Sequence, residues 1–296
     1  MIYVSLYAIL PYEVISMATS KRSASTDLAK MRNQSVVKSN DLIQKRAHLL
    51  SLQEQKIILF LISQLKPDQK DFDYQSFDII DFCEICGIES QQGKNYSTLK
   101  SAVKSLSDKS MWVVGENRDI LMRWIQKAEI ERGSGTINIM FDPDMKPFLL
   151  ELKNKYTQFD LIYTLTMRSK YSVRLYEILK SYEKTGEPVQ MSLQRFQELI
   201  GSEYGRWQDI KRRIVEPAIK EINEVGDLRV LYTTKKKGKA IVGITFSVKL
   251  KRDFEQQVET HRAIQARLDG AREPSEPAQP VEPIPGQLSL DGSVVE

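Results

Sequence analysis

Residues 207–223 read Trp-Gln-Asp-Ile-Lys-Arg-Arg-Ile-Val-Glu-Pro-Ala-Ile-Lys-Glu-Ile-Asn, a pattern that predicts an amphipathic helix. At 100° per residue, a helix gathers one stripe for packing, formed by Trp207, Ile210, Ile214, Ala218 and Ile222. The opposite side is polar and carries Asp209, Arg212, Arg213, Glu216 and Lys220, with Arg206 and Gln208 at its margins. A helix of this kind docks on a small domain and presents guanidinium and amide groups to the major groove of DNA. An ordinary amphipathic surface helix has the same pattern, so the neighbouring sequence must decide between them.

A β-hairpin is predicted directly after this helix. Residues 228–234 alternate between apolar and polar like a strand, and residues 240–248 form a second strand-like run. The predicted turn between them is basic and contains Lys235, Lys236, Lys237, Gly238 and Lys239. A helix followed by a hairpin with a lysine-rich tip is typical of a winged helix, whose wing contacts phosphates. Basic residues also keep an exposed sheet edge soluble, but helix and wing together favour nucleic acid.

The same order of elements is predicted earlier in the chain. Residues 51–65 predict a helix that begins with a capping box of Ser51 and Glu54, and they align with residues 168–182. Residues 77–87 align with 191–201, and in both a short strand leads into a helix that stops at glycine. Residues 96–108 take the place of the 207–223 helix, with Leu99, Val103 and Leu106 buried. Residues 111–114 and 120–125 predict a hairpin that 137–141 extends.

We therefore predict an α+β fold of two tandem winged-helix domains related by an internal repeat, with disordered N- and C-terminal tails. Residues 1–34 form a disordered or marginal lead, and the first winged helix spans 35–152. The second winged helix spans 158–252 and is more basic at its helix and wing. Residues 253–296 form a helical extension and a tail rich in proline and glutamate, which is expected to be disordered.

The composition is that of an ordinary soluble protein with a basic body. The chain has 296 residues, 41% of them hydrophobic and 28% charged, with a net charge of +4. Residues 273–296 hold five acids and no lysine or arginine, so 43 basic and 34 acidic residues remain and give residues 1–272 a net charge of +9. A basic body attracts polyanions. The sequence predicts no membrane span and no signal peptide, and hence a cytoplasmic location.

Three patterns that suggest catalysis or metal binding are incomplete. Five residues rather than four separate Gly87 from Gly93, and Asn95 stands where a phosphate loop needs a hydroxyl. Cys83 and Cys86 lack further zinc ligands, because the two histidines, His48 and His261, are far apart in sequence. The apolar helical context of the two cysteines favours buried structural thiols over a redox pair. A His-x-His nicking site is missing, so we predict no enzymatic activity, cofactor or metal.

Four segments of the chain resemble the iteron-binding replication initiators of theta-replicating plasmids, the initiator Rep family. They are residues 37–43, 52–57, 169–182 and 211–223, and the last two are specific for the family. The resemblance covers about residues 35–252. It implies binding of double-stranded DNA at directly repeated origin sites, origin opening, and recruitment of host replication proteins such as a helicase or initiator. It also implies dimers that repress the protein's own promoter.

In that family the second domain makes the main base contacts, and the first provides a weaker DNA footing and the dimer interface. By the helical wheel, the second domain's DNA-contacting residues are Arg206, Gln208, Lys211, Arg212 and Arg213, with the wing residues Lys235, Lys236, Lys237 and Lys239. Lys211 falls within the apolar stripe and reaches a phosphate only along its stem. The first domain's candidates are Lys94, Asn95, Ser97, Lys100 and Lys104. Pro217 breaks helix rules, but the family shares it, so we expect a kinked, continuous helix.

The tail contains a candidate sliding-clamp motif. Gln287, Leu288 and Leu290 resemble the clamp-binding pattern Gln-Leu-Ser/Asp-Leu-Phe, but Asp291 replaces the aromatic anchor. A chance apolar run in a biased tail explains the residues equally well.

The leading function is therefore a DNA-binding initiator of plasmid replication. The alternative is a transcriptional repressor without a replication role, which would bind a single inverted repeat rather than direct repeats. A purely structural interaction module would not show tight, salt-dependent duplex binding.

Overall fold

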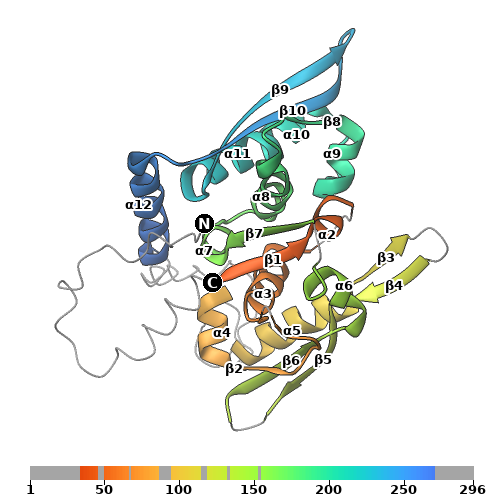
Figure 1. Cartoon of the computed structure of the whole chain (residues 1–296), viewed down its shortest axis with the longest axis vertical. Helices are drawn as coiled ribbons and strands as arrows, with labels where there is room; N and C mark the ends of the chain where they lie inside the picture. The colour runs from red at the N-terminus through yellow and green to blue at the C-terminus, as the bar shows by residue number, and fades with distance from the viewer. Residues whose placement is uncertain are drawn as a thin grey trace, which may run out of the picture.

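The computed structural model describes residues 34–45, 50–66, 68–86, 95–114, 119–131, 134–152 and 155–270 (Figure 1). The chain has two halves, and each combines helices with a small antiparallel sheet. The first half contains β1 (Ser35–Ser39), α2 (Asn40–Lys45), α3 (Leu52–Ser63), β2 (Gln75–Asp78), α4 (Ile79–Cys86), α5 (Asn95–Asp108), β3 (Ser110–Val114), β4 (Asp119–Arg123), β5 (Ile125–Ile130), β6 (Thr136–Phe141), η3 (Pro143–Met145) and α6 (Lys146–Leu149). The second half contains β7 (Tyr156–Asp160), α7 (Leu161–Leu165), α8 (Lys170–Tyr182), η4 (Glu183–Thr185), β8 (Val189–Ser192), α9 (Leu193–Ile200), α10 (Trp207–Ile210), η5 (Lys211–Val215), α11 (Glu216–Val225), β9 (Leu228–Lys237), β10 (Ala240–Leu250) and α12 (Phe254–Gly270).

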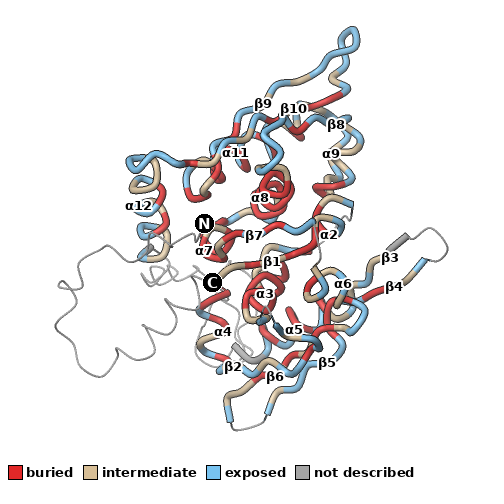
Figure 2. Tube along the Cα trace, viewed as in Figure 1, coloured by how far each residue is buried: buried red, intermediate tan, exposed pale blue. Residues whose placement is uncertain are grey.

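The second half is a winged helix built around α8. This helix is buried along most of its length, and α9, α11 and the sheet β8-β10-β9 surround it (Figure 2). Both ends of α9 are determined by local sequence. The Ser192 hydroxyl accepts the N–H of Arg195 at the start, and Gly201 ends the helix with φ of 66°. A positive φ at a helix end is far less costly for glycine than for other residues, so the predicted stop at this position is confirmed.

The first half repeats this arrangement. The predicted capping box is present at α3, because Ser51 accepts the N–H of Glu54 while the Glu54 carboxylate accepts the N–H of Ser51. Leu99 and Leu106 of α5 are fully buried, as their spacing predicts. The sheet order β2-β6-β5 matches β8-β10-β9 of the second half. The prediction of two winged-helix domains is therefore confirmed.

One predicted hairpin was wrong in its extent. Residues 120–125 were expected to form a single strand that pairs with 111–114 and is extended by 137–141. Instead, β3 and β4 form a two-stranded sheet of their own, and β6 pairs with β2 and β5. The chain leaves the two-stranded β3–β4 sheet at Trp124. This residue is 2% exposed, and its carbonyl accepts a hydrogen bond from the N–H of Asp142. Burial of this indole turns the chain, so the wing of the first half is β5–β6.

Equivalent strands of the two halves pair with each other at the centre of the molecule. β1 and β7 run antiparallel, with Val37 opposite Gln158, and each leads directly into a short helix (Figure 1). The N–H of Asn40 donates to the carbonyl of Lys155 at 2.7 Å, and the N–H of Leu161 donates to the carbonyl of Gln34 at 2.8 Å. These reciprocal bonds describe a local pseudo-twofold relation between the halves.

The short helices cross over at this axis. α2 of the first half packs on α8 of the second, and α7 of the second half packs on α3 of the first. Each winged helix therefore contributes a helix to the packing surface of the other. This exchange makes the two halves a single packed unit around α3 and α8.

Candidate nucleic-acid interface

The reading helix of the second half runs from Trp207 to Val225 as α10, η5 and α11. Its predicted packing stripe is confirmed, because Ile210, Ile214 and Ile222 are fully buried. Trp207 is half-buried and packs near the ring of Tyr232 on β9, with ring centroids 6.5 Å apart. The stripe thus attaches the helix to both the helical core and the base of the wing.

The middle of this helix is a π-helical turn over Lys211–Val215. The N–H of Glu216 donates to the carbonyl of Lys211, five residues earlier. Pro217 has no N–H, so the carbonyl of Arg213 loses its usual donor four residues on. The chain accommodates this by widening the preceding turn rather than by ending. The prediction of a continuous helix through Pro217 is confirmed, and π turns of this type are frequent at functional sites.

The polar residues predicted to contact DNA lie on the outer face of this helix. Arg206, Gln208, Arg212 and Arg213 are exposed, and the side chain of Arg212 is 73% exposed. Lys211 is half-buried, with its ammonium 3.3 Å from Glu216 Oε1, as expected for a stem that lies along the apolar stripe. Contact of these residues with DNA stays a prediction.

Two acids share this face. Asp209 Oδ1 lies 3.7 Å from Arg212 Nη2 and 4.0 Å from Arg213 Nε, and Glu216 pairs with Lys211. A shallow open groove follows the helix surface, lined by Gln208, Asp209, Lys211, Arg212 and Glu216. Burial raises the pKa of Tyr232, and the nearby Glu216 carboxylate raises it further. The acids keep the basic side chains close to the helix surface.

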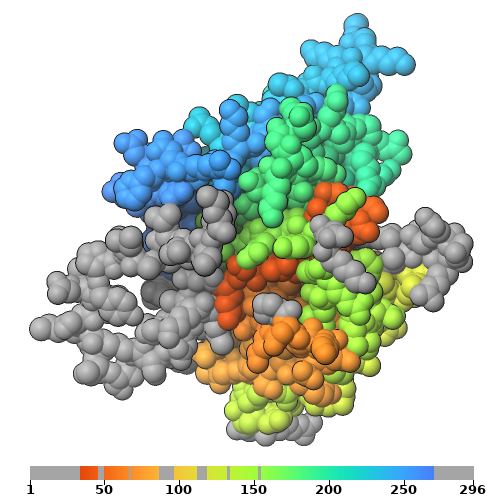
Figure 3. Space-filling model, in the orientation of Figure 1, coloured from red at the N-terminus to blue at the C-terminus, as the bar shows by residue number. Residues whose placement is uncertain are grey.

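The wing is longer than predicted. Its strands continue through the lysines, with Lys237 opposite Ala240, so the loop is only Gly238 and Lys239. Gly238 has φ of 61°, a conformation that favours glycine. The four lysines are exposed, and the wing projects as a narrow arm from the second half (Figure 3).

Alternation along β9 separates the wing lysines. Val230 and Tyr232 point to the side that carries the core and the reading helix, and Lys236 has the same parity. Lys235 and Lys237 have the opposite parity, which they share with the exposed Leu231. By strand alternation, Lys236 falls on the reading-helix side and Lys235 and Lys237 fall on the outer side.

The first half presents a different surface. On α5, Ser97, Lys100 and Lys104 are exposed, and the Lys104 ammonium lies 2.5 Å from Asp108 Oδ2. Lys94 and the side chain of Asn95 lie outside the described residues. The exposed face of α5 carries serine, threonine and lysine rather than arginine, which suits phosphate contact better than base reading.

Buried charges join the two halves. Lys38 on β1 pairs with Glu177 on α8, and burial lowers the pKa of Lys38 although Glu177 opposes the shift. Arg174 on α8 is 2% exposed and donates to the carbonyls of Leu199 and Ile43, at 3.0 and 2.7 Å. Burial lowers the pKa of Arg174 to about 10. The carbonyl of Ile43 lies near the end of α2, so a cation from the second half binds the negative end of a helix from the first.

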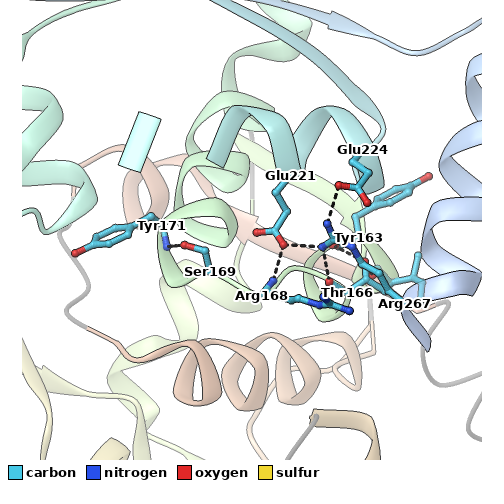
Figure 4. Close-up of polar contacts among 9 residues, drawn as sticks. Tyr163, Thr166, Arg168, Ser169, Tyr171, Glu221, Glu224 and Arg267 are labelled. Atoms are coloured by element: carbon cyan, nitrogen blue, oxygen red, sulfur yellow. Dashed lines mark hydrogen bonds and ion pairs between the residues drawn. The ribbon is translucent and has the colours of Figure 1, made fainter. Parts of the chain in front are cut away.

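The reading helix is also attached to α12 (Figure 4). Arg267 of α12 donates to Glu221 Oε1 at 2.6 Å, to Glu224 Oε2 at 2.9 Å and to the carbonyl of Thr166 at 3.0 Å. The same Glu221 oxygen accepts the N–H of Arg168 at 2.8 Å. Just before the N-terminal end of α12, the buried Lys251 donates to the carbonyl of Asn223 and to the Thr260 hydroxyl. α12 thus supports the C-terminal part of α11.

Two features important for the site were missed from the sequence. Tyr204 lies under Arg213, with the guanidinium carbon 5.3 Å from the ring centroid, and Asp209 was not assigned a role. Only an aromatic residue in a glycine-bounded loop before a basic helix signalled Tyr204. Gln287, Leu288 and Leu290 of the tail lie outside the described residues, as do residues 1–33.

The two cysteines show no sign of reactivity. Cys83 and Cys86 are buried, as predicted, and burial raises the pKa of the Cys83 thiol to about 11. Among the described residues, no three His, Cys, Asp or Glu side chains group as metal ligands. In the same part of the chain, every helix is too short or too polar to cross a bilayer.

Two family models match most of the described chain. The model described as initiator replication protein, WH1, matches residues 35–180, and the one described as initiator Rep protein, WH2, matches residues 192–248. A replication initiation protein of Escherichia coli is 22% identical over 256 residues, which cover 81% of this chain and 77% of that protein. The crystal structure of the Pi initiator protein in complex with iteron DNA has a TM-score of 0.62 at 18% identity, covering 75% of this chain and 99% of that one. The likeness to that structure shows a shared fold.

Proposed function

This chain belongs to the initiator Rep protein family, and on that premise we propose that it starts plasmid replication by binding directly repeated origin sites, or iterons. The Pi initiator, whose fold it shares, was solved with iteron DNA. The observation that carries the proposal is the pairing of the reading helix with the wing. Exposed Arg212 and Arg213 lie on a helix that is held to the core, and a wing of four exposed lysines starts beside it.

Each part has a role in binding duplex DNA. The reading helix enters the major groove, where an arginine fork and the Gln208 amide recognise base edges. The wing lysines and α5 of the first half contact phosphates, which position the protein without reading sequence. Because the two halves pack as one unit, a monomer presents both surfaces in a fixed relation to one origin repeat.

The proposed action needs no catalysis. Binding to several adjacent repeats distorts the origin, and the distortion is supported by binding free energy rather than by a chemical step. Host replication proteins, such as a helicase or initiator, then join the opened DNA. Dimers formed through the first half repress the protein's own promoter, and the protein acts in the cytoplasm where plasmid DNA lies.

Footprinting on DNA that flanks the gene tests this proposal. We expect several protected direct repeats, with protection that weakens steeply from low to high salt. Arg212→Ala and Arg213→Ala should each lower specific binding by about 1–3 kcal/mol. A single protected inverted repeat would instead support a repressor without a replication role. No protection at either salt concentration would contradict DNA binding near the gene.

A second experiment tests the sliding clamp as a partner. The wild-type protein and Gln287→Ala are each used to pull down the host clamp. Recovery that depends on Gln287 supports the motif at 287–290. Equal recovery contradicts it.

A further inference from the structure

We infer that Arg213 reads a guanine base, that Tyr204 and Asp209 hold its guanidinium for this task, and that Arg212 contacts phosphate instead. The inference rests on the proposed function and names the residue that determines sequence preference. The two arginines are adjacent in the sequence, equally charged and both exposed, so composition cannot separate them. Their surroundings do.

Arg213 has two neighbours that restrict its guanidinium. Its guanidinium carbon lies 5.3 Å from the centre of the Tyr204 ring, within the range of a cation–π contact. Its Nε lies 4.0 Å from Asp209 Oδ1. A guanidinium held over a ring keeps its N–H edge available while the number of side-chain conformations falls. Less conformational freedom is then lost when that edge binds a base.

Tyr204 is itself held in place. Its carbonyl accepts the Gln197 side-chain amide of α9 at 2.8 Å, and its N–H donates to the Ser202 hydroxyl at 3.2 Å. The ring packs on the hydrophobic core at its inner side. The loop between α9 and the reading helix is therefore a platform for the arginine rather than a simple connection.

Arg212 shares the Asp209 carboxylate with Arg213 but not the contact with the Tyr204 ring. Its side chain is 73% exposed against 53% for Arg213, and its ion pair with Asp209 is made by Nη2 at 3.7 Å. It lines the open groove with Lys211 and Glu216, and no aromatic ring of the described residues lies beneath it. Recognition of guanine O6 and N7 needs a fork of fixed orientation, whereas a phosphate accepts a cation from many directions. Arg213 has the geometry for the first task and Arg212 for the second.

Charge-preserving substitutions test the assignment. Wild type, Arg213→Lys and Arg212→Lys are compared on a duplex selected by the wild type from a random-sequence pool and on a scrambled duplex of equal length. For Arg213→Lys, we expect the ratio of the two affinities to fall about 5- to 150-fold with an unchanged salt slope, because lysine keeps the charge and loses the fork. For Arg212→Lys, the ratio should stay within about twofold of the wild type.

The platform has its own variants. Tyr204→Phe keeps the ring and should keep the ratio, whereas Tyr204→Leu should lower the ratio without changing affinity for the scrambled duplex. If Tyr204→Leu also lowers the melting temperature, Tyr204→Met, which is closer in length, replaces it.

The outcomes separate the inference from the proposed function. If the wild type selects no sequence from the pool, the proposed function fails. If it selects one and Arg212→Lys loses as much discrimination as Arg213→Lys, or more, the assignment of Arg213 is overturned. If the ring-free Tyr204 variant that keeps the wild-type melting temperature also keeps the wild-type ratio, the platform is overturned while the base contact stands.

Discussion

Lys38 on β1 and Glu177 on α8 form a buried ion pair between the two halves of the molecule, with Nζ and Oε1 2.5 Å apart. Both side chains are at most 5% exposed, and Arg174 Nη1 lies 3.8 Å from the second carboxylate oxygen of Glu177. Burial of charge is costly unless the charges are paired. The pair therefore ties the correct docking of the halves to the stability of the whole chain.

Loss of one partner should destabilise the protein strongly. Lys38→Met leaves the Glu177 carboxylate buried with Arg174 alone, so the free energy of unfolding should fall by about 3 kcal/mol. Urea unfolding followed by circular dichroism measures it. The control is Lys45→Met, which removes an exposed pair with Asp41 and should change stability by less than about 0.5 kcal/mol. Equal effects of the two variants would contradict the structural role of Lys38.

Glu54 predicts an acid-dependent part of the stability. Burial opposes its ionisation, but hydrogen bonds from Lys109, Ser105 and Ser51 outweigh burial and keep the pKa of Glu54 below its ordinary value. The unfolded chain therefore binds this proton more readily than the folded one. Its stabilising contribution is present above pH 4.5 and is lost as the pH falls through the lower pKa of the folded state.

Glu54→Gln isolates that contribution. The variant should be less stable than the wild type at about pH 7, and the difference should shrink at about pH 3. Urea midpoints at both pH values measure it. A difference that stays constant with pH would show that the ionisation of Glu54 is not the cause.

Arg267 should control the attachment of α12. Arg267→Ala removes three hydrogen bonds to α11 and to the end of α7, and it leaves Glu221 partly buried with one donor fewer. Hydrogen exchange should become faster in α12 and around residues 166–168. Arg262→Ala on the exposed side of the same helix is the matched control and should leave exchange unchanged. Identical exchange in both variants would rule out this role for Arg267.

The wing lysines should differ in their contribution to DNA binding. Lys236 lies on the reading-helix side of β9, so Lys236→Ala should reduce the salt slope of binding by about 0.9 for one lost phosphate contact. Lys235→Ala removes the same charge from the outer side and should leave the slope nearly unchanged. Both are measured on the duplex protected in the footprint. A larger change for Lys235 would mean that the opposite face of the wing meets the DNA.

Local patterns in the sequence predicted the parts of the fold that depend on neighbouring residues. The stripe of Ile210, Ile214 and Ile222 follows from helix periodicity, and the capping box at Ser51 follows from a spacing of three. Gly201 ends its helix because the backbone there is left-handed. In the site, the same periodicity predicted which side of the reading helix faces out, including both arginines.

Features that depend on distant contacts were missed. Lys235, Lys236 and Lys237 have low strand propensity and suggested a turn, but pairing with β10 keeps them in the strand. Trp124 has high strand propensity and suggested a continuous strand, but burial of its indole ends β4. The pairing of Val37 with Gln158 joins residues far apart in the chain, and no local period indicates it. Tyr204 was missed for the same reason, since its role depends on Arg213 in another element.

The exchange of α2 and α7 between the halves has a consequence for how such proteins can diverge. A cut at the short connection before β7 would leave α8 without α2 and α3 without α7, so each half would lose a helix that packs on it. We therefore expect recombination between relatives to produce stable chimaeras only when the residues of this crossing come from the same parent, so that Lys38 still meets Glu177 and Arg174 still meets the carbonyl of Ile43. DNA specificity, by contrast, resides in a helix and loop outside that crossing. Evolution can then change the target sequence while the joint between the halves is inherited as a block.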